Sequence, residues 1–315
     1  MRIFRHDTVA AAERGAVVAI GNFDGVHLGH QAVIGEAGRI ARAQGLPHAV
    51  LTFEPHPRRL FRPGDPPFRL TPFRAKSRHI EALGVDLLFT LHFDLAFSQR
   101  SAADFIETVL VRNLGVRHAV VGYDFVFGRR RGGSPALLEA RGAELGFGVS
   151  VVGPIAAQGG AVYSSTRIRE LLVGGKPREA AALLGRFWDI EGRVERGEAR
   201  GRTIGFPTAN LMLDDYLRPA AGVYAVRVGI EEVGRTQWHD GVANLGQRPT
   251  FGGTDLRLEA HLFDVDRDLY GRHLRIALIE HLRPERKFPG IDALKTQIAA
   301  DAAQARALLQ AEPAP

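Results

Sequence analysis

Alternating hydrophobic patterns in the first half of the chain constrain its fold most strongly. Short apolar runs rich in β-branched residues, typical of buried strands, are separated by segments whose apolar residues have helical spacing. Strands are expected over residues 16–20, 49–53, 85–91, 118–122 and 148–152. Helices are expected over residues 31–44, 75–83, 102–114 and 135–145. This order predicts a parallel sheet with helices on both faces, which binds ligands at the carboxyl ends of its strands.

The pattern changes after Val162. Two short helices, each ended by a glycine, are expected over residues 164–175 and 176–185. From Trp188 onward, short alternating runs separated by turn residues predict a small antiparallel barrel. These runs are WDIEGRV, GVYAVRVGI, GVANLG, LRLEAHLFD and LRIALIEHL, and a helix is expected after them over residues 292–310. We therefore expect an N-terminal domain over residues 1–185 and a C-terminal domain over residues 186–315.

Composition limits the chemistry that the chain can use. Its 315 residues include no cysteine, which excludes disulfides, thiolate nucleophiles and cysteine-ligated metals, and a reducing cytoplasm is the expected location. No apolar run reaches the about 18 residues that a membrane span needs, and no signal peptide is evident. The formal net charge of +6 favours anionic partners. The densest basic cluster, Arg129–Arg131, is either a solvated loop or a flap over a phosphate site.

The stretch GNFDGVHLGH, residues 21–30, follows the first predicted strand. Glycines after a strand let the backbone approach a bound group and offer it N–H donors, and a helix that begins there adds its positive dipole end. His27 and His30, three positions apart, lie on one face of the first helical turn and can donate to the same phosphate. Two structural histidines, or a metal site without an obvious third ligand, are the alternatives.

Several motifs resemble one enzyme family. GNFDGVHLGH resembles the H-x-G-H signature of Rossmann-like nucleotidyltransferases, and with Gln31 it resembles the FAD synthetase module of bacterial bifunctional riboflavin kinase/FAD synthetases. LTFEPHP, VVGYDFVFG and YSSTRIR are similar to three further motifs of that module. Val126 stands where an arginine is common, so the contact made by that arginine is in doubt, although Arg129–Arg131 could compensate.

The resemblance implies roles for residues of the N-terminal domain. His27 and His30 would polarise the α-phosphate of ATP. The residues expected to bind ATP or its phosphates are Gly21, Asn22, Phe23, Gly25, Ser165, Thr166 and Arg169. The residues expected near the flavin are Phe53, Pro55, Asp124 and Phe125. A serine and a threonine at a helix start can also serve as caps alone, which is the simpler explanation of SSTRIR.

A second unusual stretch is GEARGRTIGFPTANL, residues 197–211. Its many turn residues predict a hairpin loop. Thr208 and Asn210, however, offer neutral oxygens of the kind that Mg²⁺ accepts. The stretch resembles the G-R-x-x-G-F-P-T-A-N motif of riboflavin kinases. The resemblance implies that Thr208 and Asn210 hold Mg²⁺ and that Glu259 is the catalytic base. The residues that would cover the ATP phosphates are Gly201, Arg202, Gly205 and Pro207.

The expected fold is therefore a Rossmann-like nucleotidyltransferase domain followed by a riboflavin kinase-like barrel with a terminal helix. The expected enzyme phosphorylates riboflavin with ATP to FMN and then transfers AMP from ATP to FMN, giving FAD and pyrophosphate. Its partners would be ATP, riboflavin, FMN and Mg²⁺, with no nucleic acid and no membrane, and a weak homo-oligomer is compatible with the sequence. Three alternatives stay open: a single active module, a nucleotidyltransferase for another phosphorylated acceptor, and a basic protein that binds nucleic acid or flavin without turnover.

Overall fold

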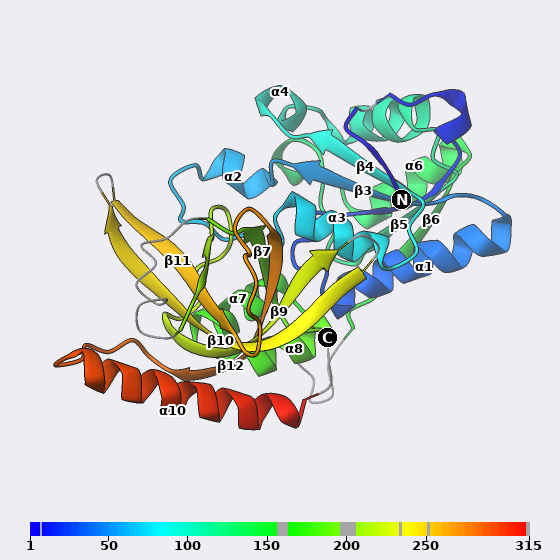
Figure 1. Ribbon diagram of the computed structural model, residues 1–315. Coiled ribbons are helices and arrows are strands. Elements are labelled where there is room, and N and C mark those ends of the chain that lie inside the picture. The colour runs from blue at the N-terminus through cyan, green and yellow to red at the C-terminus, as the bar shows by residue number, and fades with distance from the viewer. Residues whose placement is uncertain (7, 156–162, 196–205, 233–234, 251–252, 313–315) are drawn as a thin grey trace. The chain divides into compact units, whose positions relative to one another are not determined.

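A computed structural model of the chain describes residues 1–6, 8–155, 163–195, 206–232, 235–250 and 253–312. The contacts within the chain divide it into two compact units (Figure 1). Unit 1 comprises Met1–Pro66 and Thr71–Ser164, and unit 2 comprises Pro67–Leu70 and Ser165–Pro315. None of the helices in these described ranges is long and apolar enough to cross a lipid bilayer.

Unit 1 contains a six-stranded sheet in which every neighbouring pair of strands is parallel. The strand order is β1-β4-β3-β2-β5-β6. The strands are β1 (Arg2–Phe4), β2 (Val17–Ile20), β3 (His48–Glu54), β4 (Leu87–His92), β5 (His118–Gly122) and β6 (Gly148–Val152). Because all strands are parallel, the loops after β2, β3 and β4 meet at one edge of the sheet. The predicted parallel α/β sheet is thus confirmed.

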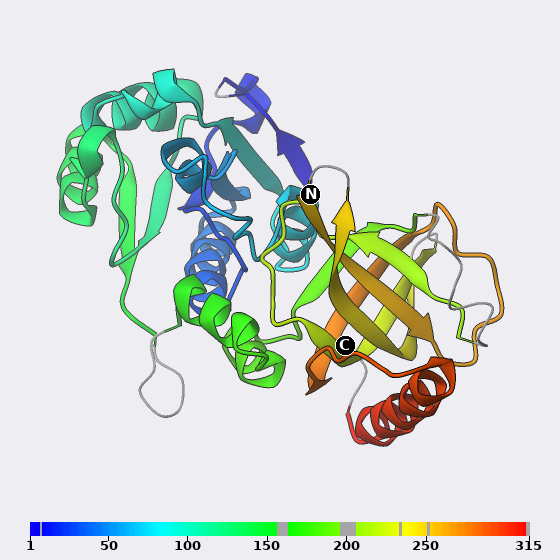
Figure 2. The same ribbon diagram turned by 90° about the vertical axis from the view of Figure 1, so that its left-hand side faces the viewer.

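Helices cover both faces of this sheet, as Figure 2 shows. On one face, α1 (Leu28–Gln44) and α3 (Phe73–Glu81) pack on the strands through a core that includes Ile34 and Ile80. On the other face, a core that includes Ile106 and Leu138 lies under the π-helical segment η2 (Phe105–Asn113) and α6 (Pro135–Leu145). The remaining short elements are η1 (Ala11–Glu13), α2 (Pro57–Phe61), α4 (Leu95–Ser98), α5 (Ala102–Asp104) and η3 (Arg129–Arg131).

Unit 2 is an antiparallel six-stranded barrel with the strand order β7-β12-β9-β10-β11-β8. An isolated bridge between Glu195 and Asn210 connects the β7 side to β8, which nearly closes the ring. The strands are β7 (Asp189–Arg193), β8 (Ala209–Met212), β9 (Gly222–Glu232), β10 (Arg235–Thr250), β11 (Gly253–Leu262) and β12 (His273–Arg283). The helices are α7 (Ser165–Val173), α8 (Pro177–Leu184) and α10 (Ile291–Gln310).

Helix α10 lies along the outside of the barrel (Figure 1), where Ala305 and Leu309 join an apolar cluster with residues of β9, β10 and β12. Two arginines fix it there. The buried Arg227 of β9 donates to the Leu309 carbonyl at the end of α10 (2.9 Å). Arg283 of β12 makes a bidentate pair with the buried Asp301 of α10, at 3.0 and 2.8 Å. Each arginine thus has a hydrogen-bond acceptor on α10.

The structure divides the chain at a different place from the expected boundary at residue 185. Helices α7 and α8 belong to the barrel unit, and so does the short segment Pro67–Leu70 from the first half of the chain. That segment is held by hydrogen bonds: the indole N–H of Trp188 donates to the Leu70 carbonyl, and the Leu217 N–H donates to the Arg69 carbonyl, both at 2.7 Å. The sequence reading also missed β1 and β8, because each strand is only three or four residues long.

His48 provides a test of packing in unit 1. It is buried on β3 between α1 and the loop before β4, with Nε2 at 2.9 Å from the Ile34 carbonyl and Nδ1 at 3.2 Å from the Gly84 carbonyl. Burial holds the pKa of His48 below its ordinary value, although the two carbonyls oppose this shift. The unfolded chain therefore takes up a proton that the folded chain resists. The stability that depends on neutral His48 is present above about pH 6.5 and is lost as the pH falls.

We expect urea unfolding to show that the free energy of unfolding of the wild type declines from about pH 7 to about pH 5. A His48→Gln variant should decline less over the same range, because it removes this titrating group. Equal declines in the two proteins would contradict the assignment.

Candidate active sites

The loop after β2 begins at Gly21 and leads into α1. Its backbone is unusual, because Phe23 and Val26 have φ of 48° and 42° and Gly25 has φ of 91°. Side chains other than glycine adopt this region rarely, and bulky ones at a cost of about 1–3 kcal/mol each. The surrounding structure must therefore hold the loop in place.

Buried hydrogen bonds supply that restraint. The Gly25 N–H donates to Thr71 Oγ1 (2.8 Å), and the Thr71 N–H donates to Asp24 Oδ1 (3.0 Å). Asp24 and Thr71 are almost completely buried. The Gly21 N–H donates to the Leu51 carbonyl (3.1 Å), so the loop starts at a fixed point beside β3. Hydrogen bonds within the protein therefore preorganise the loop.

The two histidines lie together at the start of α1, as predicted. His27 is the N-cap residue, and its Nδ1 accepts the His30 N–H at 3.3 Å. A neutral His27 therefore carries its proton on Nε2, where it can serve as a donor. The rings of His27 and His30 are stacked, with centroids 3.6 Å apart and planes at 20°. Phe23 meets His30 edge-on at 5.3 Å, so both rings are restrained. The pair thus places two nearly parallel imidazole rings at the N-terminus of α1.

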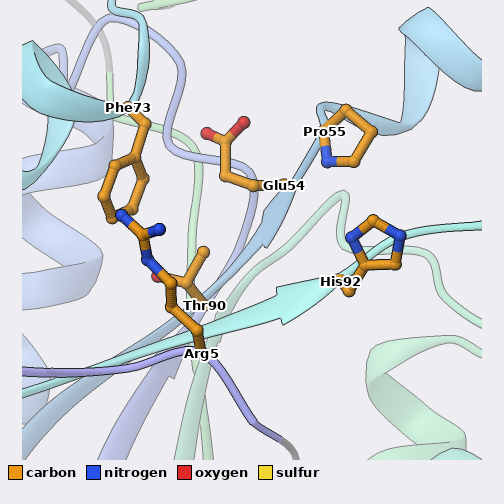
Figure 3. A pocket seen from close by; sticks show the side chains of 6 residues that line it. All are labelled: Arg5, Glu54, Pro55, Phe73, Thr90 and His92. Carbon is orange, nitrogen blue, oxygen red and sulfur yellow. The ribbon is translucent and has the colours of Figure 1, made fainter.

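A cavity of about 400 Å³ lies at the same edge of the sheet. Glu54 and His92 stand at the ends of β3 and β4. Figure 3 shows the guanidinium of Arg5 against the ring of Phe73, and the two are 5.0 Å apart. The full lining is Arg5, Glu54, Pro55, Phe73, Thr90 and His92. Thr90 Oγ1 is buried without a hydrogen-bond partner, so the wall carries a polar atom that a ligand could satisfy.

The residues predicted to lie near the flavin are not all brought together. Pro55 lines the cavity, whereas Phe53 is 8% exposed and packs within a cluster of phenylalanines, at 5.9 Å from Phe97. Asp124 and Phe125 follow β5, which pairs with the other side of β2. The structure thus places these four residues on both sides of the histidine loop.

Other predicted contacts lie around the same sheet or in unit 2. The exposed Val126 and Arg129–Arg131 follow β5. In unit 2, Ser165 and Thr166 start α7, and Arg169 of that helix donates through Nε to the Phe68 carbonyl (2.8 Å). The structure therefore gives Arg169 a role in holding the segment Pro67–Leu70. Phosphate binding by these three residues of α7 stays a prediction.

The second predicted site lies on the outer face of the barrel. Asn210 of β8 is directly opposite Glu259 of β11, and Glu259 is directly opposite Asn244 of β10. Residues directly opposite each other in an antiparallel pair project from the same face. Thr208 lies in the segment that leads into β8, two residues before Asn210. Two amides and a carboxylate therefore form one polar row across three strands, and the Thr208 hydroxyl lies just before the first of them in sequence.

The approach to β8 is held by His261. Its Nδ1 lies 2.8 Å from the Pro207 carbonyl, and because a carbonyl only accepts, this nitrogen carries the proton. The ring of His261 meets Phe206 edge-on at 5.4 Å. Gly201, Arg202 and Gly205, which were predicted to cover the ATP phosphates, lie outside the described residues.

The polar row also fits the predicted Mg²⁺. Thr208, Asn210 and Glu259 offer hard oxygen donors, and Mg²⁺ commonly takes few ligands from protein and the rest from phosphates and water. Within the described ranges, no cluster of three or more histidine, aspartate or glutamate side chains is arranged to hold a metal. A site with few protein ligands and a bound nucleotide is consistent with this arrangement.

Comparison with known proteins shows which families the two parts of the chain match. The FAD synthetase family matches residues 9–167, and the riboflavin kinase family matches residues 184–309. The bifunctional riboflavin kinase/FMN adenylyltransferase of Escherichia coli K12 is 42% identical over 97% of each chain. This chain belongs to the bifunctional riboflavin kinase/FMN adenylyltransferase family.

Two further proteins extend the comparison. The family member from Bacillus subtilis 168 is 38% identical and covers 95% of this chain and 94% of its own. A crystal structure described as a macrolide-efflux protein from Streptococcus pneumoniae is 32% identical, with a TM-score of 0.84. It covers 96% of this chain and 98% of its own, so the two-part fold is found in a solved structure. The family resemblance predicted from the sequence is confirmed.

The sequence patterns did not point to several polar residues that lie at or beside the two candidate sites. Asn244 faces Glu259 only in the strand register, which the sequence alone does not reveal. Lys76, which is fully buried beside the histidine loop, lies one helical turn from Ile80 on the apolar side of α3. No sequence pattern indicated Arg5, Thr90 or His92, because only the strand order brings them together.

Gly25 should be needed for the conformation of the histidine loop. Its φ of 91° is strained for any other residue, so Gly25→Ala should destabilise unit 1 by about 1–2 kcal/mol and lower FMN adenylylation. Gly35→Ala is the matched control, because Gly35 is exposed in α1 with open space around it. That variant should be as stable as the wild type or more so. Unfolding curves and FAD formation of both variants test this, and a Gly25→Ala protein with normal adenylylation would reject the preorganised loop.

Proposed function

We propose that the two reactions of the family are performed at separate sites in this chain. The chain phosphorylates riboflavin to FMN and adenylylates FMN to FAD. The polar row on the barrel is assigned to the first reaction, and the histidine loop of unit 1 to the second. This assignment rests on the geometry found at each motif. In unit 1, two stacked histidines lie at a helix N-terminus. In the barrel, a carboxylate lies opposite an asparagine on one face.

For adenylylation, a phosphate oxygen of FMN attacks the α-phosphorus of ATP and pyrophosphate leaves. Negative charge is spread over the oxygens of the reacting α-phosphate. His27 and His30 would donate hydrogen bonds to these oxygens, and the amide groups at the start of α1 would add their partial positive charge. No covalent intermediate with the protein is required, because FMN is itself the nucleophile. The protein then acts by positioning and by stabilising charge.

The cavity beside the histidine loop is the proposed place for the FMN acceptor. It lies at the ends of β3 and β4, and β3 is the strand next to β2. Phe73 offers an aromatic face, and Thr90 offers a hydroxyl. Arg5 supplies a cation for an anionic ligand. This assignment places the acceptor one strand away from the histidines that would hold the α-phosphate.

For phosphorylation, Glu259 would accept the proton of the riboflavin hydroxyl as its oxygen attacks the γ-phosphorus of ATP and ADP leaves. Asn210, which lies on the same face of the barrel as this carboxylate, would hold Mg²⁺ together with Thr208. The bound ion would supply partial neutralisation of the phosphate charge. Asn244 flanks Glu259 on the other side and would help to fix its orientation.

Three finer points complete the proposal. Its cofactor is Mg²⁺, its location is the cytoplasm, and its small-molecule partners are ATP and the flavins. A weak homo-oligomer is compatible with it. Activity confined to one module is disfavoured, because both halves match their families over most of their length. If unit 1 adenylylated an acceptor other than FMN, the presence of a riboflavin kinase domain in the same chain would be unexplained.

Replacing His27 or His30 by alanine should impair FAD formation from FMN and spare FMN formation from riboflavin. Loss of one donor to a developing charge lowers kcat by about a hundredfold or more. His118→Gln is the control, because His118 contacts Ser150 at the amino end of β5, at the opposite edge of the sheet. Separate assays of the two reactions give the answer, and equal loss of both activities would indicate a folding defect instead.

Glu259→Gln should have the reverse effect. It removes the proposed base while keeping size and hydrogen bonding, so riboflavin phosphorylation should fall by about a hundredfold or more while FMN-to-FAD conversion persists. Glu179→Gln, at an exposed carboxylate of α8, is the control and should retain both activities. Chromatography of flavins after a fixed incubation measures both. Normal FMN production by Glu259→Gln would reject the assigned base.

A further inference from the structure

Lys76 of α3 is completely buried, and its ammonium contacts oxygens of Glu54, Thr52 and Asn22. Its ammonium Nζ lies 2.8 Å from Glu54 Oε1, 3.2 Å from Thr52 Oγ1 and 3.2 Å from the Asn22 carbonyl. We propose that Lys76 is a positioning residue for FMN adenylylation, which fixes the histidine loop relative to the acceptor cavity. This inference rests on the proposed function of unit 1.

The three partners come from the two structures that the reaction must align. Asn22 belongs to the histidine loop, two residues after β2. Thr52 and Glu54 belong to the end of β3, and Glu54 lines the cavity. The hydroxyl of Thr52 also donates to the Asn22 carbonyl (3.2 Å). One ammonium therefore connects the loop assigned to ATP with the wall assigned to FMN.

Stability alone does not explain a charge at this place. Taking an ammonium and a carboxylate out of water costs several kcal/mol per ion, and well-packed apolar side chains of similar volume are often as stable. The neighbouring positions Ala75 and Ile80 of α3 are filled by apolar residues that are fully buried. An ammonium does what an apolar group cannot, because its N–H groups donate hydrogen bonds to several oxygens at once.

The charge of Lys76 also matters for the ligand. Glu54 is a carboxylate in the wall of a cavity assigned to an anionic acceptor, and by itself it would repel a phosphate. The ion pair with the buried Lys76 offsets the negative charge of Glu54. The loop beside it is strained at Phe23 and Val26, so a lost contact at Asn22 would let it relax. A shift of about 1 Å in a reacting group can lower a rate about a hundredfold.

The test separates positioning from stability through a double substitution. Lys76→Met removes the ammonium that pairs with the partly buried Glu54 carboxylate and should destabilise unit 1. Lys76→Met with Glu54→Gln removes both charges and should recover stability close to that of the wild type. In the double variant the Asn22 carbonyl keeps the Thr52 donor. Thr52→Val, which removes the hydroxyl that accepts from Lys76 and donates to Asn22 but preserves the shape of the side chain, is an independent second variant.

The matched control is Arg2→Met with Glu13→Gln. This pair is also an ion pair of unit 1 with a buried carboxylate, but Arg2 lies opposite Leu87 at the amino end of β4, away from the cavity. For every protein, kcat and KM for FAD formation are measured per folded molecule, with the folded fraction taken from unfolding curves. Riboflavin phosphorylation in the same preparation serves as an internal standard, because it belongs to unit 2.

We expect the double variant at Lys76 and Glu54 to lose kcat by about tenfold to a hundredfold, with KM for ATP changed less than about threefold. Thr52→Val should show a smaller loss, and the control pair should keep wild-type kcat. Wild-type kcat per folded molecule in both the double variant and Thr52→Val would overturn the inference. If the wild type itself forms no FAD from FMN, the function assigned to unit 1 fails, and the inference fails with it.

Discussion

The histidine loop depends on the buried contact between Asp24 and Thr71. A backbone with positive φ at Phe23, Gly25 and Val26 does not persist by local preference. The hydrogen bonds from Gly25 to Thr71 and from Thr71 to Asp24 hold it, and they also tie the loop to the chain just before α3. Once this loop is fixed, His27 caps α1 and its ring stacks on His30. The geometry assigned to adenylylation follows from a few buried polar contacts.

In the barrel, the register of the paired strands determines where the polar side chains lie. A polar residue on one strand meets the polar residues of its neighbours only if the pairing is fixed, and a slip of one position would send each to the other face. Here Asn210, Glu259 and Asn244 are paired across β8, β11 and β10. The apolar contacts of α10 and its two arginine anchors hold neighbouring strands of this barrel. Both units thus place polar side chains through backbone geometry.

Much of the fold could be predicted from sequence, because strand and helix periods differ and glycines mark the ends of helices. The five predicted strands of unit 1 and the terminal helix were found within a few residues. The motifs predicted the family and the two histidines. They could not predict Lys76, Thr90 or Asn244, whose importance depends on which strands are neighbours. The division of the chain into two units after Ser164 could not be predicted either, because it depends on long-range hydrogen bonds to residues 67–70.

The central claim is that one chain carries two independent sites that act in sequence. The most direct measurement is a time course of purified protein with riboflavin, ATP and Mg²⁺, with flavins separated by chromatography. The account predicts that FMN rises first and that FAD follows, and that added FMN is converted to FAD without riboflavin. Folded protein that leaves riboflavin unchanged, and that forms no FAD from added FMN, would contradict it.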